Sequence, residues 1–159
     1  MFLIERVILV TANLGALTSL FFLPRSKALQ HHLVFLVVGL PTWIIGLLVV
    51  EWDLLAYPVR EFASINRTSF CFEYFLLPVA CIHYNAWYPE TRPRWVKALY
   101  LLFFCTALTV PEAFVERYTQ LIRYQHWDWY VTFITEGLLF LFSRAMLRWF
   151  FRPSSHRMT

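Results

Sequence analysis

The sequence predicts an all-α fold, a polytopic transmembrane helical bundle of five spans, with four spans as the alternative if the first segment is peripheral. Hydrophobic residues make up 59% of the 159 residues and charged residues only 15%, whereas a soluble domain carries about 45–50% and about 25%. The apolar residues gather in segments that each approach the roughly 20 residues required to cross a bilayer core. Tryptophans fall near the ends of these segments, where indole rings anchor helices at the interface: Trp52, Trp87, Trp95, Trp127, Trp129 and Trp149.

Residues 1–150 are predicted to form one transmembrane domain, because this length leaves room for a single bundle and no second folded domain. The spans are predicted at about 7–23, 33–50, 70–87, 96–118 and 129–150. Residues 151–159 form a short polar tail that we expect on the cytoplasmic side.

The local sequence explains where these segments begin and end. Arg25 and Lys27 close the first segment, and no small-residue cleavage motif follows, so we expect a retained helix rather than a removed signal peptide. Pro41 lies in the middle of the second segment, where its missing N–H predicts a kink. Residues 51–69 mix charged and aromatic side chains, as expected of a connector at the membrane interface. Asp128 directly precedes the fifth segment and is placed to cap its N-terminus.

The distribution of basic residues predicts an outside N-terminus and a cytoplasmic C-terminus. Five spans put the two ends on opposite sides, and cytoplasmic loops carry an excess of Lys and Arg. In this orientation the cytoplasmic side holds Arg25, Lys27, Arg92, Arg94, Lys97, Arg148, Arg152 and Arg157, and the outer side holds Arg6, Arg60, Arg67, Arg117 and Arg123. The net charge of +4 is spread between apolar segments and forms no dense patch. We therefore expect no nucleic-acid partner, and the lipid bilayer is the predicted one.

Four glutamates are predicted to lie in the outer half of the bilayer. Glu73 is about four residues inside the third segment, or about 6 Å, and Glu136 is about seven residues inside the fifth, or about 10 Å. Glu112 and Glu116 fall in the last turns of the fourth segment and share one helix face, because they are spaced i, i+4. A carboxylate that faces lipid is costly, so Glu73, Glu112 and Glu136 are expected to face the bundle interior.

Such acids cannot all be ionised together unless a cation lies among them. Either some are protonated, or an arginine or a metal ion neutralises them. Arg117 is one candidate for that partner, with Arg60 and Arg67 on the same side. Two hypotheses stay open: the cluster binds a cation, a proton or a small polar ligand, or it is a hydrogen-bond and ion-pair network that only fixes helix packing. The sequence identifies neither a metal nor a cofactor.

His83 and Arg144 are predicted to lie deeper, in an inner layer that Asn85 can share. Arg144 is also long enough to snorkel to the cytoplasmic headgroups. No second His or Cys lies at ligand spacing from His83, which disfavours a metal site there. His83 and Arg144 join the acids and Arg117 as candidate ligand-binding residues.

Motifs that would indicate an enzyme are missing. There is no phosphate-cradling Gly-rich loop, no H-E-x-x-H zinc helix and no G-x-S-x-G nucleophile elbow. We therefore expect a transporter, a sensor or an accessory subunit. A structural or scaffolding subunit is the alternative, and an intramembrane lipid-modifying enzyme is a weaker one. With four glycines and no G-x-x-x-G, dimerisation through small residues is unsupported, but a protein partner or a homo-oligomer stays open.

Three motifs resemble a known family. FEYFLLPVACIHYNAWYPE (72–90) and EAFVERYTQLIRYQHWDWY (112–130) carry most of the resemblance, AYPVREF (56–62) adds an aromatic-proline connector, and a closing apolar helix carries Arg144. Across residues 56–147 the chain is similar to a family of small uncharacterised multi-pass membrane proteins of spore-forming Firmicutes. The resemblance implies a helical protein of the bacterial plasma membrane and supplies no substrate, cofactor or catalytic residue. Asp128 departs from many members of the family, which have Asn after the tryptophan.

Overall fold

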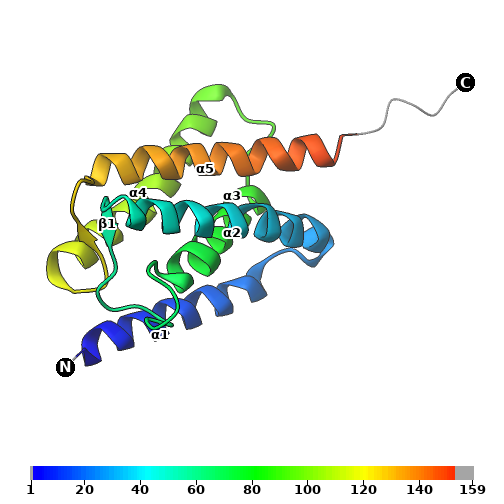
Figure 1. Cartoon of the computed structure of the whole chain (residues 1–159). Coiled ribbons are helices and arrows are strands. Elements are labelled where there is room, and N and C mark those ends of the chain that lie inside the picture. The colour runs from blue at the N-terminus through cyan, green and yellow to red at the C-terminus, as the bar shows by residue number, and fades with distance from the viewer. Residues whose placement is uncertain (1, 153–159) are drawn as a thin grey trace, which may run out of the picture.

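The computed structural model describes residues 2–152, and the predicted tail beyond Arg152 lies outside the described residues. The long helices are α1 (Leu3–Ser19), α2 (Ala28–Glu51), α3 (Leu77–Ala86), α4 (Arg94–Tyr118) and α5 (Trp129–Phe150). A π-helical segment, η3 (Cys71–Leu76), leads into α3, while the 3-10 turns η1 (Leu20–Phe22) and η2 (Arg25–Lys27) join α1 to α2. The strands β1 (Leu55–Ala56) and β2 (Arg123–Tyr124) lie in the α2–α3 and α4–α5 connectors. Figure 1 shows the arrangement.

Within the described residues, four helical segments are long and apolar enough to cross a membrane: Leu3–Phe22, Arg25–Glu51, Arg94–Tyr118 and Trp129–Phe150. Together with the composition, they are consistent with an integral membrane protein. The predicted third segment is not among them. It is six π-helical residues followed by ten α-helical residues, or about 24 Å at 1.5 Å per residue, against a hydrocarbon core of about 30 Å.

The helix α3 forms the centre of the bundle. It is apolar all round, the pattern expected of a helix buried on every side, and eight of its ten residues are buried, whereas α1 buries none. Its polar Asn85 donates a hydrogen bond to Ser143 Oγ on α5 at 2.9 Å. Tyr84 of α3 packs against Phe140 of α5, with their ring centroids 4.8 Å apart. These contacts join the C-terminal turn of α3 to α5.

Two glycines let α2 approach η3 and α3 closely. A Cβ on Gly39 would lie 3.4 Å from Pro78 Cγ, and one on Gly46 would lie 2.9 Å from Glu73 Cγ and Cδ. The seven-residue spacing places both glycines on one face of α2, two turns apart. Small residues at such a contact permit tight helix packing in membranes, although here the glycines serve an intramolecular contact.

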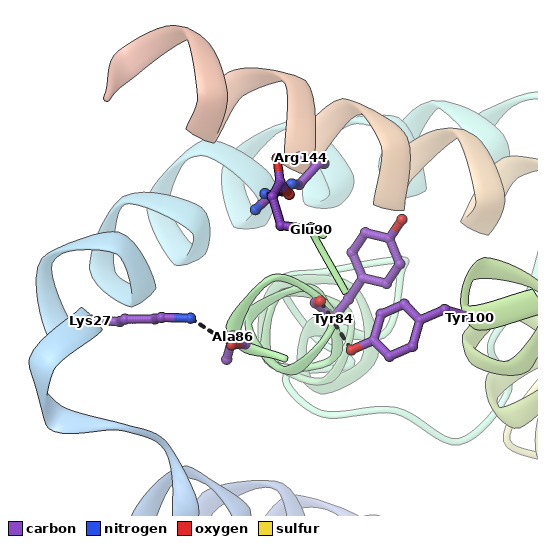
Figure 2. Close-up of polar contacts among 6 residues, drawn as sticks. All are labelled: Lys27, Tyr84, Ala86, Glu90, Tyr100 and Arg144. Atoms are coloured by element: carbon purple, nitrogen blue, oxygen red, sulfur yellow. Dashed lines mark hydrogen bonds and ion pairs between the residues drawn. The ribbon is translucent and has the colours of Figure 1, made fainter. Parts of the chain in front are cut away.

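The connectors gather at two opposite ends of the bundle. Leu55 and Ala56 of β1 pair antiparallel with Tyr124 and Arg123 of β2, so the α2–α3 and α4–α5 connectors meet at the end where α1 begins (Figure 1). At the other end Lys27 Nζ donates to the Ala86 carbonyl at 2.8 Å (Figure 2). This alternation is the one that the predicted order of spans requires.

The α-helices overlap the predicted spans, and their ends differ from the predicted ranges at several places. α5 has the predicted limits and α4 ends at the predicted residue, but α1 begins at Leu3 and α2 at Ala28. Polar residues in these first turns do not end the helices, because they are solvated or bond locally. His32 Nδ1, for example, lies 2.7 Å from the Ala28 carbonyl oxygen one turn back. Asp128 occupies the N-cap of α5 as predicted, but its side chain makes no capping hydrogen bond.

Candidate acidic site

The structure brings Glu73, Glu112 and Glu136 to one cavity. Glu73 comes from η3, Glu112 from α4 and Glu136 from α5, and their exposed fractions are 8%, 8% and 5%. All three line a cavity of about 400 Å³. We call these residues the acidic cluster. It lies toward the β1–β2 end of the bundle, because Glu112 is bonded to Tyr124 of β2.

The π-helical turn that presents Glu73 has a local cause. Within η3 the N–H of Leu77 bonds back to the carbonyl of Phe72, five residues earlier. In the same register the next donor would be Pro78, which has no N–H and leaves the Glu73 carbonyl free. The hydroxyl of Thr42 on α2 donates to that carbonyl at 2.7 Å. The side chain of Glu73 then accepts a hydrogen bond at Oε1 from Tyr57 OH at 3.0 Å.

Glu112 and Glu136 are joined by a reciprocal pair of threonine bonds between α4 and α5. Thr109 on α4 donates to Glu136 Oε2 at 2.9 Å, and Thr132 on α5 donates to Glu112 Oε1 at 2.8 Å. Each threonine thus lies one turn before the acid of its own helix and bonds the acid of the other helix. Tyr124 OH also donates to Glu112 Oε1 at 2.8 Å.

Each carboxyl group has one oxygen without a side-chain hydrogen bond. Tyr57, Tyr124 and Thr132 all donate to an Oε1 atom, so Oε2 of Glu73 and Glu112 receives none of these bonds. Glu136 Oε1 is fully buried and has no hydrogen-bond partner among residues 2–152. A buried acceptor without a partner costs about 1–3 kcal/mol, so a donor supplied by a ligand would be stabilising there.

The cluster has no cationic partner in the described chain, and the predicted arginine partners were wrong. Arg60 donates to the backbone carbonyls of Tyr57 and Asn66, and Arg67 pairs with Glu51 at 2.8 Å. Arg117 is exposed. Arginines near a membrane surface can reach water or headgroups instead of turning inward, and here neutral hydroxyl groups take the place expected of a guanidinium.

The two tyrosines of the site are protonated donors. Tyr57 is fully buried, and this burial together with the nearby Glu73 carboxylate raises the pKa of its hydroxyl well above the ordinary value. Burial and the charge of Glu112 likewise raise the pKa of Tyr124. Both hydroxyls therefore stay protonated at physiological pH and donate hydrogen bonds to the carboxylates.

No preformed metal centre is visible in the described part of the chain. There, no group of three or more His, Cys, Asp or Glu side chains could hold a metal ion. The three carboxylates share a cavity without converging on one coordination point. A ligand that spans several ångströms suits this arrangement better than a bare ion.

Apart from three threonines and Tyr57, the rest of the cavity wall is apolar, and part of it comes from side chains of α2 and α5 that are also exposed on the outside of the bundle. Pro41 and Ile45 line it from α2, and Leu138 and Phe142 line it from α5. Ile45 is 56% exposed and Leu138 is 62% exposed. In an apolar helix of a membrane protein, such exposed side chains face lipid. The cavity therefore has an acidic inner wall and an apolar opening.

The other predicted site residues lie elsewhere. Glu116 is half-buried one turn beyond Glu112 and lines neither cavity, and the predicted inner layer of His83 with Arg144 is not formed. Arg144 pairs with Glu90 (Figure 2) and lies 4.4 Å from the ring centroid of Tyr88. His83 instead faces α1. Depth along a helix does not fix which face a residue occupies. His83 on α3 contacts Ser19 of α1, whereas Arg144 on α5 contacts Glu90 and Tyr88.

His83 lies in a second cavity, of about 480 Å³, between α1, α3 and α4. Its Nε2 lies 2.8 Å from Ser19 Oγ, and Ser19 Oγ lies 2.7 Å from the Ala16 carbonyl oxygen. A carbonyl only accepts, so the serine proton goes to Ala16 and the imidazole N–H donates to the serine oxygen. This is the reverse of the polarity that activates a serine nucleophile. The contact gives no support to an enzyme.

The hydroxyl donors of the site were missed at the sequence level. Thr109 precedes Glu112 by three residues and Thr132 precedes Glu136 by four, so each pair lies on one helix face. That pattern in two apolar helices was the available signal. Tyr57 and Gly46 carried no comparable signal, because their role depends on how the α2–α3 connector and α2 pack against η3.

Comparison of the chain with known protein families, with curated proteins and with solved structures gives no match. The resemblance to the small multi-pass family of spore-forming Firmicutes therefore stays a prediction.

Proposed function

We propose that this chain is a five-span protein of the plasma membrane whose acidic cluster binds a proton or a small ligand that carries positive charge or hydrogen-bond donors, as a transporter, a sensor or an accessory subunit would. The observation that carries the proposal is a cavity lined by three buried carboxylates, Glu73, Glu112 and Glu136, with no cationic side chain to neutralise them in residues 2–152.

The energetic argument concerns charge. An ionised carboxylate removed from water without a compensating cation costs several kcal/mol, and hydroxyl donors such as Thr109 and Thr132 offset only part of that cost. Three such groups at one cavity must take up protons, a cation or both. A site with three acidic side chains, no neutralising cation and a cavity beside them is suited to reversible binding of a proton or a cation.

The proposed topology has an outside N-terminus and a cytoplasmic C-terminus. It is supported by the excess of Lys and Arg at the end of the bundle that holds the α1–α2 and α3–α4 connectors. The short third span fits this topology, because η3 and α3 run between the two ends inside a sheath of longer helices. The connector over residues 52–69 then covers their outer end.

The test compares ligand response in purified full-length protein. Methylammonium is the probe for a small cation, and protonated carboxyl groups are followed by their infrared carbonyl band as the pH changes. In wild type we expect methylammonium to raise the unfolding temperature, by the equivalent of about 2.7 kcal/mol at one hundred times its Kd. Glu112→Gln and Glu136→Gln should abolish this rise and remove intensity from the carbonyl band.

Glu116→Gln is the matched control, because Glu116 carries the same charged group one turn from Glu112 and lines neither cavity. It should behave like wild type. If wild type responds neither to methylammonium nor to pH in the carbonyl band, the binding function is excluded.

A structural role is the second candidate, and the reciprocal bonds of Thr109 and Thr132 favour it specifically, because they tie α4 to α5. A brace predicts that Glu112→Gln and Glu136→Gln change the unfolding temperature while wild type shows no ligand response. The same experiment thus separates the two functions.

A further inference from the structure

We propose that the ligand of the acidic cluster is an amphipathic organic cation, an ammonium group on an apolar body, which reaches the site sideways from the bilayer between α2 and α5. This inference rests on the proposed binding function and adds the chemical class of the ligand and its route.

The charged end of the ligand is specified by the free oxygens. Glu136 Oε1 is buried without a partner, and the hydrogen bonds accepted by Glu73 and Glu112 fall on Oε1, leaving one oxygen on each. A primary ammonium has three donors and no acceptor, which suits a cavity lined by carboxyl groups that no cationic side chain of the described residues neutralises. The rings of Tyr57 and Trp127 also line the cavity, and aromatic rings attract organic cations.

A bare metal ion does not account for the rest of the cavity. The volume of about 400 Å³ lies within the range of small-molecule sites, which begins at about 300 Å³. Beyond the acids and three threonines, the lining is aliphatic or aromatic, as with Pro41, Ile45, Leu138 and Phe142. Such a wall offers a metal ion no ligand and no water-ordering group, whereas it offers an alkyl or aryl body dispersion contacts and exclusion from water.

The opening of the cavity faces the same environment as the outer surface of the helices. Ile45, Leu138 and Phe142 line the cavity, and all three are also exposed on the outside of the bundle. These side chains belong to the middle of α2 and α5, away from the connectors at both ends of the bundle. A molecule dissolved in the hydrocarbon therefore meets the opening directly, and its charged group can move from the interface to the acids without crossing bulk water.

The experiment uses the full-length chain in phosphatidylcholine nanodiscs and a photoreactive octylamine that carries a diazirine on its alkyl chain. Crosslinked residues are identified by mass spectrometry. We expect labelling on α2 and α5 around Ile45 and Leu138, reduced at least about tenfold by excess octylamine and much less by excess octanol, which lacks the charge. Glu136→Gln should reduce the labelling by a similar factor.

Leu138→Trp tests the route. The Leu138 side chain already faces outward at the opening, so the larger indole ring of tryptophan would fill it. Leu141→Trp is the matched control: Leu141 lies on the same helix, is 49% exposed and lines neither cavity. We expect Leu138→Trp to reduce octylamine labelling about tenfold and Leu141→Trp to leave it unchanged. Methylammonium binding, followed by thermal shift, should survive Leu141→Trp.

The outcomes separate this inference from the function on which it rests. If methylammonium binds but octylamine labelling is absent, is competed equally by octanol, or is unaffected by Leu138→Trp, the amphipathic ligand and its lateral route are refuted while the binding function stands. If neither amine binds and the carbonyl band does not respond to pH, both are refuted.

Discussion

Replacing Gly46 with alanine is predicted to displace the carboxyl group of Glu73 from Tyr57. A Cβ at position 46 would lie 2.9 Å from Glu73 Cγ and Cδ and 3.0 Å from Thr68 Oγ1. Thr68 is fully buried, so the side chain with room to move is that of Glu73, toward the cavity. That movement breaks the 3.0 Å hydrogen bond from Tyr57.

The expected cost follows from three terms. Overpacking a buried contact costs about 1–3 kcal/mol, and loss of one buried hydrogen bond costs about 0.5–1.5 kcal/mol. Alanine in place of glycine in a helix returns about 1 kcal/mol. Gly46→Ala should therefore lower the free energy of unfolding by about 0.5–3.5 kcal/mol and weaken methylammonium binding, because one wall of the site has moved.

The assay is equilibrium unfolding in mixed dodecyl maltoside and SDS micelles, followed by circular dichroism. Gly15→Ala is the matched control, since a Cβ there would meet no atom within 4 Å, and it should be neutral or stabilising by up to about 1 kcal/mol. A double-mutant cycle with Tyr57→Phe then tests the mechanism. If Gly46→Ala already breaks the Tyr57 bond, the tyrosine substitution adds little in its presence, and the two effects are not additive.

The reasoning is wrong if Gly46→Ala is as stable as Gly15→Ala and binds methylammonium like wild type. It is also wrong if Gly46→Ala and Tyr57→Phe are additive, because the alanine would then act without moving Glu73. Either result would mean that α2 shifts as a body and absorbs the extra methyl group.

Three further predictions concern the surroundings of the site. Thr109→Val should lower the free energy of unfolding by about 1–3 kcal/mol in the same SDS titration, because it leaves Glu136 Oε2 without its donor. Thr132→Val should also be destabilising, because it removes one of two donors to Glu112 Oε1 and the acceptor of the Trp127 indole N–H; equal stability of both variants to wild type would show that the reciprocal bonds contribute nothing. Burial raises the pKa of Tyr57, so the stability that the tyrosine hydroxyl contributes is complete below the ordinary pKa and is lost as the pH rises through the higher folded-state pKa. The stability difference between wild type and Tyr57→Phe, measured by thermal unfolding, should therefore shrink only in strongly alkaline buffer. A shrinking difference near neutral pH would contradict this prediction. Arg144→Gln should cost less than about 1 kcal/mol, because its partner Glu90 is half-exposed, and it should leave methylammonium binding unchanged; a loss of binding would place Arg144 in the site after all.

Much of the architecture was predictable because two strong physical rules act on the sequence. Long apolar runs must be helical in a bilayer, and a carboxylate in such a run avoids lipid. These rules were enough to expect the helices and to turn Glu73, Glu112 and Glu136 inward. They were not enough to count the spans, because η3 and α3 together are too short and too buried to show the signature of a lipid-facing helix.

The chemistry around the acids was less predictable, because it depends on rotation and on tertiary contacts. Arg117 and Glu112 are close in sequence, yet five residues correspond to about 500° of helix rotation, which places them on different faces. The hydroxyl of Tyr57 reaches Glu73 only because β1 and β2 pair and hold the connector over the cavity. The π-helical turn likewise depends on Pro78 together with Thr42 from another helix.

The hydrogen bonds within the cluster raise the question of why the residues are acids at all. Glutamine at position 112 or 136 could accept the same hydroxyl hydrogen bonds from Thr132 and Thr109 through its carbonyl oxygen, without an ionisable group to bury. Bracing alone therefore gives no physical reason to place three carboxyl groups around one cavity, and it leaves the buried Glu136 Oε1 as a cost. A function that takes up positive charge gives a reason for both features. The methylammonium response is decisive for this reason: a binding site predicts that wild type and Glu116→Gln respond and that Glu112→Gln does not, whereas a brace predicts no response in any of the three.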